Sequence, residues 1–349
     1  MTSFAPDYQN LQKAAFNKAA NRLPLYEHVI SDKLMETILG KEFRELRYGD
    51  AREKEEYFKT YCDFYLKMGY DTFSFECPIC HIMPHGGLLG GHGESVIKSY
   101  LDFEKYPWDD IPEIFFSTFS QDFDALKKVM PSGMKGVGGV GNGIFETVQD
   151  VMGFMHLAYT SSDDPELYEA LFRKVGDIFL AIWTRFMELY GDMYCVLRMG
   201  DDLGFKTNTL LPTNDIRRLI VPEYARVVGL VHAYNKPFLL HSCGNIFDVM
   251  DDIIGTAKIN AKHSNEDQIG AFPIWVERYG ERIGNFGGID TDAVCRLSAP
   301  EIKEYVIDTL RRVENCGGIA FGSGNSIPEY VPADNYLAMV NAVREYRDG

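Results

Sequence analysis

The sequence has no long apolar run and no excess of basic residues. None of its apolar segments reaches the roughly 18 residues that a membrane-spanning helix needs. Lys and Arg number 35 against 51 Asp and Glu, which gives a formal net charge of −16. Such a charge repels phosphate backbones and anionic lipid headgroups, so we expect neither nucleic acid nor a membrane as a partner.

Further absences bear on location and fold. Residues 1–16 lack the apolar core of a signal peptide, and the seven cysteines are expected to be reduced thiols, so we expect a cytoplasmic protein. No Gly-x-Gly-x-x-Gly motif opens a helix after the first predicted strand, which counts against a dinucleotide-binding fold. The chain has no linker and no repeat of fixed period, so we expect a single domain over residues 1–349.

What the sequence does contain is an alternation of short apolar runs with amphipathic stretches, which begins near residue 70 and predicts a parallel sheet. With an eighth strand in the irregular stretch 80–130, the pattern predicts an α/β fold, a (β/α)8 TIM barrel over residues 61–349. Residues 1–60 are predicted to form an N-terminal helical extension that leads into it. The predicted strands are Asp71–Cys77, Gly133–Val140, Met193–Gly200, Pro237–Cys243, Ala257–His263, Arg282–Gly288 and Gly318–Gly322. The predicted helices are Phe145–Tyr159, Pro165–Tyr190, Asn214–Tyr234, Ile246–Ile254, Pro273–Tyr279, Pro300–Asn315 and Asp334–Tyr346.

Polar residues cluster directly after the predicted strands. In a barrel the carboxyl ends of the strands converge on one face, where active sites lie. Packing alone does not explain polar groups at so many successive strand ends, so we expect the functional site there. The clusters are Glu76–Cys77, Gly200–Asp202, His241–Cys243, His263–Glu266, Gly288–Asp290 and Gly322–Asn325.

The segment around His241 is a candidate metal site. His241 and Cys243 are two residues apart at a strand end, so their side chains are expected on the same side. An imidazole nitrogen and a thiolate are the pairing that zinc prefers. The alternative is a core histidine beside a small buried thiol. His263 and Glu266, at the end of the next strand, are candidate third ligands.

Two other segments carry chemically active side chains. Asp201 and Asp202 follow a strand and either bind substrate, act as a base or cap the next turn. Residues 77–81 contain a Cys-x-x-Cys pair, a weak zinc signal without a second pair, and the glycine-rich residues 86–93 lack the Gly-Lys-Ser/Thr end of a phosphate loop. A lid over the barrel mouth is our preferred interpretation of this stretch.

From about residue 60 onward the chain resembles the uroporphyrinogen decarboxylase superfamily, whose fold is a (β/α)8 barrel. The resemblance lies in four segments. Decarboxylases of this superfamily carry an N-terminal Arg-Gln-Ala-Gly-Arg motif that holds the substrate propionates, and residues 21–26 lack it, which argues against decarboxylation. The four segments are Gly200–Gly204, Pro237–Asn245, Gly287–Thr291 and Gly322–Pro328.

The other branch of the superfamily holds zinc-dependent methyltransferases that work with corrinoid proteins. His241 and Cys243 match their His-x-Cys motif, but Asn325 stands where they carry a later cysteine in a Gly-Cys-Gly-Ile-Pro turn. A site of His241, Cys243 and a carboxylate such as Glu266 would be less electron-rich and suited to activating an ether or hydroxyl oxygen.

The resemblance therefore implies a Zn²⁺-dependent methyltransferase that moves a methyl group between a small methylated substrate and a corrinoid protein. One alternative is a metal-free decarboxylase in which Asp202 is the acid, and another is a non-catalytic ligand-binding barrel, which the loss of the cysteine at Asn325 motivates. The expected residues are His241 and Cys243 for metal, Asp202, His263 and Glu266 for catalysis, and Glu76, Asp201 and Asn325 for substrate.

Overall fold

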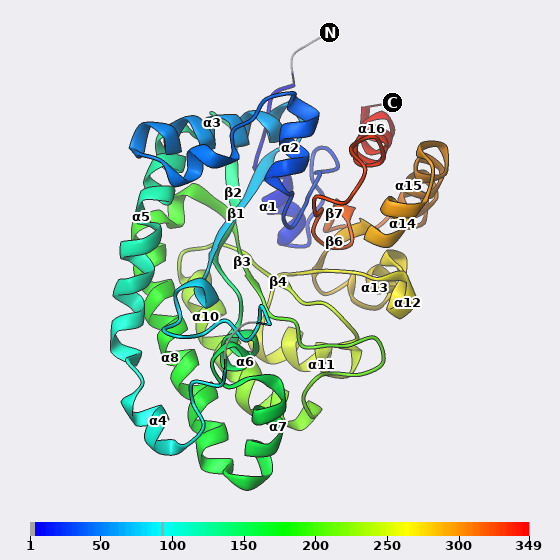
Figure 1. Ribbon diagram of the computed structural model, residues 1–349. Coiled ribbons are helices and arrows are strands. Elements are labelled where there is room, and N and C mark those ends of the chain that lie inside the picture. Colours follow the sequence, from blue (N-terminus) through cyan, green and yellow to red (C-terminus); the bar gives the residue numbers. More distant parts are fainter. Residues whose placement is uncertain (1–3, 92–93, 349) are drawn as a thin grey trace.

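The structure is a computed structural model that describes residues 4–91 and 94–348. Seven parallel strands form one curled sheet in the order of the sequence, so that each strand pairs with the next one along the chain (Figure 1). All seven predicted strands are confirmed. They are β1 Thr72–Pro78, β2 Lys135–Gly141, β3 Tyr194–Gly200, β4 Phe238–His241, β5 Ala261–His263, β6 Gly284–Ile289 and β7 Ile319–Ser323.

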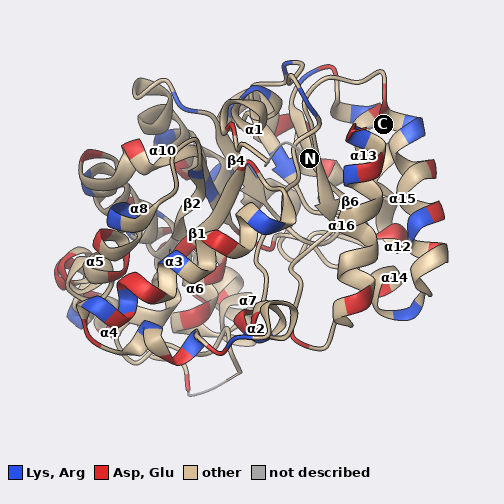
Figure 2. Cartoon of the chain, turned by 90° about the horizontal axis from the view of Figure 1, so that it is seen from above, with Lys and Arg blue, Asp and Glu red and all other residues tan. Residues whose placement is uncertain are grey.

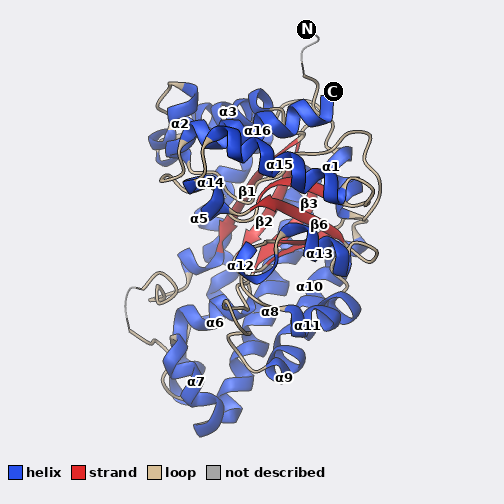
Figure 3. Cartoon of the chain, turned by 90° about the vertical axis from the view of Figure 1, so that its right-hand side faces the viewer, coloured by secondary structure: helices blue, strands red, loops and turns tan. Residues whose placement is uncertain are grey.

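Helices connect the strands and surround the sheet (Figure 3). The α/β class is therefore confirmed, but a closed barrel of eight strands is not, because the described residues of 80–130 form helices and loops without a strand. The α-helices are α1 Gln9–Ala15, α2 Asp32–Leu39, α3 Ala51–Met68, α4 Tyr100–Lys105, α5 Ile111–Val129, α6 Ile144–Met152, α7 Phe154–Asp163, α8 Pro165–Tyr190, α9 Thr213–Asp215, α10 Val221–Ala233, α11 Phe247–Asp252, α12 Asp267–Gly270, α13 Phe272–Tyr279, α14 Thr291–Arg296, α15 Ala299–Val313 and α16 Ala333–Asp348. The 3-10 helices are η1 Arg44–Tyr48, η2 Ile79–Ile82, η3 Trp108–Asp110 and η4 Gly191–Met193, and the π-helical segments are η5 Ile216–Ile220 and η6 Ile253–Ala257.

An extended segment, residues 24–30, lies between the two outer strands of the sheet. On one side Leu25 forms a parallel bridge with Phe321 of β7. On the other side the Ser74 hydroxyl of β1 donates to the carbonyl of Glu27. A stretch of the predicted helical extension therefore occupies the place that an eighth strand would take, and it brings polar residues to the inside of the sheet.

One predicted helix is divided in two. The expected helix over 145–159 ends at Met152 and restarts at Phe154, because Gly153 between them has a φ of +78°, in the left-handed region that favours glycine. By contrast α8 has the predicted bounds at both ends. The side chain of Asp164 accepts a hydrogen bond from the backbone N–H of Leu167 and so caps this helix.

Charged residues of both signs are interspersed over the outer helices and loops, while the strands are largely uncharged (Figure 2). Large side chains such as Trp183 and Phe186 of α8 are fully buried and contact each other edge to face. Among the helices of the described residues, none combines the length and the apolarity that a membrane span requires.

Candidate functional site

The carboxyl ends of β3, β4 and β5 place three polar segments side by side. Gly200, His241 and His263 occupy neighbouring register positions on these strands. The residues that follow, Asp202 and Cys243, lie in the loops directly beyond the strand ends. This confirms the expectation that polar groups from successive strand ends come together, at least for these three strands.

The imidazole of His241 and the thiol of Cys243 lie close together, although Cys243 stands in the loop rather than in the strand. The distance from His241 Nε2 to Cys243 Sγ is 3.4 Å. Asp202 joins them, because its Oδ1 lies 3.8 Å from His241 Nε2 and accepts a 2.8 Å hydrogen bond from the backbone N–H of Cys243. Sequence reasoning had not named Asp202 as a ligand.

These donors fit one zinc ion. With Zn–N and Zn–O near 2.0–2.1 Å and Zn–S near 2.3 Å, the ligand atoms of a tetrahedral N, O and S site stand about 3.3 to 3.6 Å apart. The distance of 3.4 Å from His241 Nε2 to Cys243 Sγ lies in this range, the distance of 3.8 Å to Asp202 Oδ1 is slightly longer, and the ligand atoms of all three residues lie within 4.8 Å of one another. The donor set is one nitrogen, one sulfur and one oxygen, which is a mixture that zinc accepts.

Asn325 faces the sulfur with a hydrogen-bond donor. Its Nδ2 lies 3.3 Å from Cys243 Sγ, and the Ser264 hydroxyl lies 3.7 Å from the same sulfur. Burial and the Asp202 carboxylate raise the pKa of the Cys243 thiol above its usual value. Since a neighbouring cation lowers the pKa of a thiol, metal would hold this sulfur as the thiolate, and the two donors would stabilise that form.

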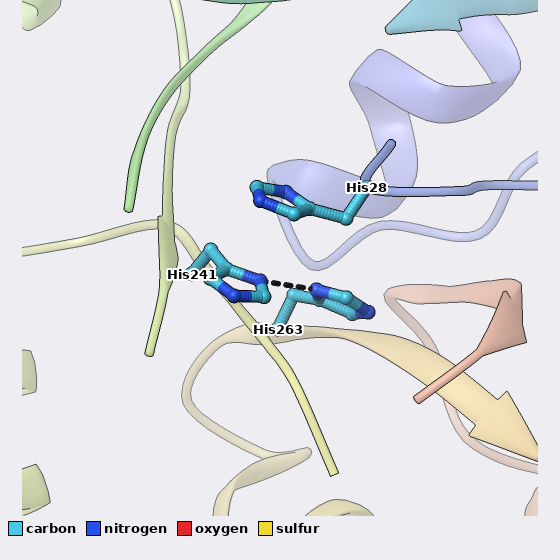
Figure 4. Close-up of side chains that lie close together, drawn as sticks. All are labelled: His28, His241 and His263. Carbon is cyan, nitrogen blue, oxygen red and sulfur yellow. Dashed lines mark hydrogen bonds between the residues drawn. The ribbon is translucent and has the colours of Figure 1, made fainter. Parts of the chain in front are cut away.

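A second group that could hold a metal ion consists of three buried residues, His28, His241 and His263, and shares His241 with the first (Figure 4). The rings of His28 and His241 stack with centroids 3.7 Å apart and an angle of 7° between their planes. An imidazole lone pair lies in its ring plane, so two stacked rings do not aim their nitrogens at one point between them. Of these two groups among the described residues, the Asp202, His241 and Cys243 group therefore fits a metal better.

Burial sets the charge of these histidines. It lowers the pKa of His28 and of His241 well below the usual value, and that of His263 to about 3. All three rings are therefore neutral near pH 7. The Nδ1 atoms of His241 and His263 are 2.7 Å apart, and His263 Nε2 lies 3.2 Å from the carbonyl oxygen of Ser323.

Asp201 is fully buried beneath the neighbouring loop. Its carboxylate accepts hydrogen bonds from the backbone N–H groups of Phe145 (3.0 Å) and Glu146 (2.9 Å) and from the hydroxyl of Tyr224 (2.5 Å). It thereby supplies hydrogen-bond acceptors to the free backbone N–H groups in the first turn of α6. Burial raises the pKa of Asp201 to about 6. Asp202, with 43 % of its side chain exposed, is the member of the pair that reaches open space.

Two other predicted residues, Glu76 and Glu266, make contacts outside the group of Asp202, His241 and Cys243. Glu76 pairs with the buried guanidinium of Arg198, whose Nη2 is 2.8 Å from Glu76 Oε2. Glu266 follows β5, and its backbone carbonyl accepts from the N–H groups of Ile269 and Gly270 at the start of α12. The metal-ligating groups found among the described residues do not include Glu266.

Two residues that sequence reasoning missed come from the segment 24–30. His28 stacks on His241, and the buried carboxyl of Glu27 bonds the backbone N–H of Ser323 at 3.1 Å. Their signal in the sequence is a titratable pair inside the apolar run Leu23–Ile30. Glu146 was missed as well, and its carboxylate accepts a 2.9 Å hydrogen bond from Asn142.

Two cavities flank the turn η2 at the same end of the sheet. One, of about 580 Å³, is walled by the loop 83–90 and by Asn142 and Asp150. The other, of about 420 Å³, is bordered by Glu76 and Arg47. The Asp150 carboxylate accepts from the backbone N–H groups of Gly87 and Leu89, which ties the glycine-rich loop to α6. The lid expected from residues 77–93 stays a prediction, and residues 92 and 93 of this stretch lie outside the described residues.

The fold and the donor group define the chain as an α/β protein with a candidate metal centre at the carboxyl ends of its parallel strands. The family model described as Uroporphyrinogen decarboxylase (URO-D) matches residues 94–346, and the chain belongs to this family. A search of curated proteins finds no match.

Two solved structures show the likeness in fold. A methyltransferase from Methanosarcina mazei has a TM-score of 0.71 at 15 % identity, with 97 % of this chain and 98 % of that chain covered. A putative vitamin-B12 independent methionine synthase from Listeria monocytogenes has a TM-score of 0.50 at 12 % identity, with 93 % and 99 % covered. At these identities the likeness concerns the fold alone.

Proposed function

We propose that the protein is a zinc-dependent methyltransferase that moves a methyl group between a small methylated substrate and a corrinoid protein. The observation that carries the proposal is the group of Asp202, His241 and Cys243 at the open end of the sheet, whose spacing fits zinc. Membership in the URO-D family and the likeness in fold to a methyltransferase support it.

In this proposal His241, Cys243 and Asp202 hold the metal. Bound zinc would supply a Lewis acid that polarises the heteroatom carrying the methyl group. A donor set with one sulfur is harder than one with two, and Asn325 offers an amide N–H to the sulfur in place of a second thiolate. This favours substrates whose methyl group is bound to oxygen, such as methyl ethers.

The protein's own groups would orient the substrate. Glu76 borders the cavity of about 420 Å³, which is large enough for a small molecule. Glu76 and Asn325 are proposed as substrate contacts, while Asp201 would support the loop that carries Asp202. We propose Glu266, which is half-buried beyond β5, for proton handling at the mouth. Much of the rate would come from holding the methyl carbon in line with the acceptor.

Metal analysis and a methyl-transfer assay test the proposal. We expect about one zinc per chain in the wild type and in Cys316→Ala, a matched control that removes an exposed thiol, and little zinc in Cys243→Ala. Methyl transfer from a panel of methoxylated and methylamine donors to a corrinoid protein should follow the zinc content. No zinc in the wild type after zinc is supplied, or no transfer from any donor, would overturn the proposal.

The second candidate function is a metal-free decarboxylase, which the description of the matching family favours. Its acid would be Asp202. Against it, the arginine of the N-terminal region, Arg22, is engaged by the buried carboxylate of Asp71 and by the carbonyl of Ala5 rather than presented to a substrate. Conversion of uroporphyrinogen to coproporphyrinogen by the purified protein would establish this alternative.

A further inference from the structure

We propose that His263 is a positioning residue: together with the carbonyl of Ser323, it fixes the tautomer of His241 so that Nε2 of His241 faces Asp202 and Cys243 as an unprotonated ligand. The inference rests on the proposed function in that His241 is taken as a ligand. It assigns His263 a role in preparing the site rather than in touching the substrate, which agrees with its complete burial.

The first step concerns His263 itself. Its Nε2 lies 3.2 Å from the backbone carbonyl oxygen of Ser323. A carbonyl oxygen only accepts hydrogen bonds, so Nε2 must carry the hydrogen. Within the interior the ring faces the aromatic ring of Tyr26 edge-on, with centroids 5.2 Å apart. A neutral imidazole has one N–H, and consequently Nδ1 of His263 is a bare acceptor.

The second step assigns the position of the hydrogen on the His241 ring. The two Nδ1 atoms are 2.7 Å apart, a distance that requires one hydrogen between them (Figure 4). Because Nδ1 of His263 is the acceptor, Nδ1 of His241 is the donor, and the lone pair of His241 is left on Nε2. That atom is the one 3.4 Å from Cys243 Sγ and 3.8 Å from Asp202 Oδ1. In metal sites generally, the hydrogen-bond partner of the ring nitrogen that does not bind the metal fixes the tautomer and the orientation of a ligating histidine.

The third step is the anchoring of both ends. Ser323 is held by Glu27, whose Oε1 accepts from the Ser323 backbone N–H at 3.1 Å, and the Ser323 hydroxyl lies 2.5 Å from the carbonyl oxygen of Asn325. His28 stacks on His241 and fixes the plane of its ring. The Ser323 carbonyl is therefore fixed in place. Through the hydrogen-bond relay from Ser323 to His263 to His241, this fixed backbone group determines the tautomer of His241.

Nuclear magnetic resonance of ¹⁵N-histidine-labelled, metal-free protein tests the tautomer directly. We expect the wild type to show His241 with a protonated Nδ1 and an unprotonated Nε2. His263→Phe keeps an aromatic ring but removes the acceptor, so His241 should become a mixture of tautomers. His263→Asn places an amide oxygen near the former Nδ1 and should restore the wild-type form. A wild-type spectrum with the hydrogen of His241 on Nε2 would overturn the inference without any mutation.

Zinc affinity, measured by competition with a chromogenic chelator, gives the second readout. We expect His263→Phe to lose about 10- to 100-fold in affinity, His263→Asn to lose less, and the control His232→Asn, a histidine of α10 that bonds Asn260, to bind as the wild type does. Equal affinities for the wild type and His263→Phe would contradict the relay. If the wild type itself binds no zinc, the proposed function fails, while the tautomer measurement still decides the relay.

Discussion

Replacing Glu27 by glutamine should change how the stability of the protein depends on pH. Glu27 is 1 % exposed, and burial raises its pKa from 4.5 to about 8. The Ser323 hydroxyl lies within hydrogen-bond distance of both the Glu27 carboxyl and the carbonyl oxygen of Asn325, and because it has one hydrogen, a protonated Glu27 would satisfy both contacts.

The magnitude follows from the two states. A carboxyl with a raised pKa binds its proton more tightly in the folded chain, so its stabilising contribution is complete below the unfolded pKa, near 4.5, and is lost as the pH rises through the folded value near 8. At about 1.4 kcal/mol per unit of pKa, the free energy of unfolding should fall by about 5 kcal/mol over this window because of Glu27. In Glu27→Gln the amide can donate to the Ser323 hydroxyl at every pH, and this loss should be absent.

Urea unfolding at a series of pH values between 5 and 8.5 measures the effect. The difference in free energy of unfolding between Glu27→Gln and the wild type should increase steadily with pH, in favour of the variant. Glu281→Gln, a change at an exposed glutamate, serves as the control and should run parallel to the wild type. A difference between Glu27→Gln and the wild type that stays constant across the range would refute the reasoning.

Three further predictions concern the loops around the metal group. Asp201→Asn should cost about 2 to 3 kcal/mol in urea unfolding, because one N–H at the start of α6 loses its acceptor, whereas Tyr224→Phe should cost only about 1; equal costs would contradict this role. Asn325 Nδ2 lies 3.3 Å from Cys243 Sγ, so Asn325→Cys should add a second thiolate and raise zinc affinity about 10-fold or more in a chelator competition. An unchanged affinity would speak against residue 325 and Cys243 binding the same metal ion. Gly204→Ala should lose zinc in elemental analysis while circular dichroism stays native, because a Cβ there would come within 2.6 Å of a backbone nitrogen in the loop after β4; full zinc content would contradict it.

The fold could be predicted from the sequence wherever local signals decide it. The alternation of short apolar or small-residue runs with amphipathic stretches predicted every strand of the sheet, and the Asp164–Pro165 start predicted the first residue of α8. The division between α6 and α7 depends on a left-handed Gly153, which periodicity does not detect. The place of residues 24–30 beside β7 depends on pairing across nearly the whole chain, for which a single sequence carries no local signal.

The candidate site shows the same limit. The closeness of His241 and Cys243 follows from their spacing at a strand end, so it could be predicted. Asp202 joins them through the register between β3 and β4, and the distinction between buried Asp201 and exposed Asp202 depends on which of the two meets the start of α6. His28 was missed because nothing near it in the sequence points to strands more than two hundred residues away.

The position of residues 24–30 has a consequence for the timing of biosynthesis. Glu27 and Ser323 are 296 residues apart, so at about 5 to 20 residues per second a ribosome makes the second partner roughly 15 to 60 s after the first. Until then the nascent chain has no Ser323 carbonyl to order the histidines, and residues 24–30 lack β7 as their partner strand. Premature termination between Cys243 and β7 would therefore yield a chain that carries His241 and Cys243 but lacks the Ser323 carbonyl, and on the proposed function metal would be acquired only after synthesis is complete.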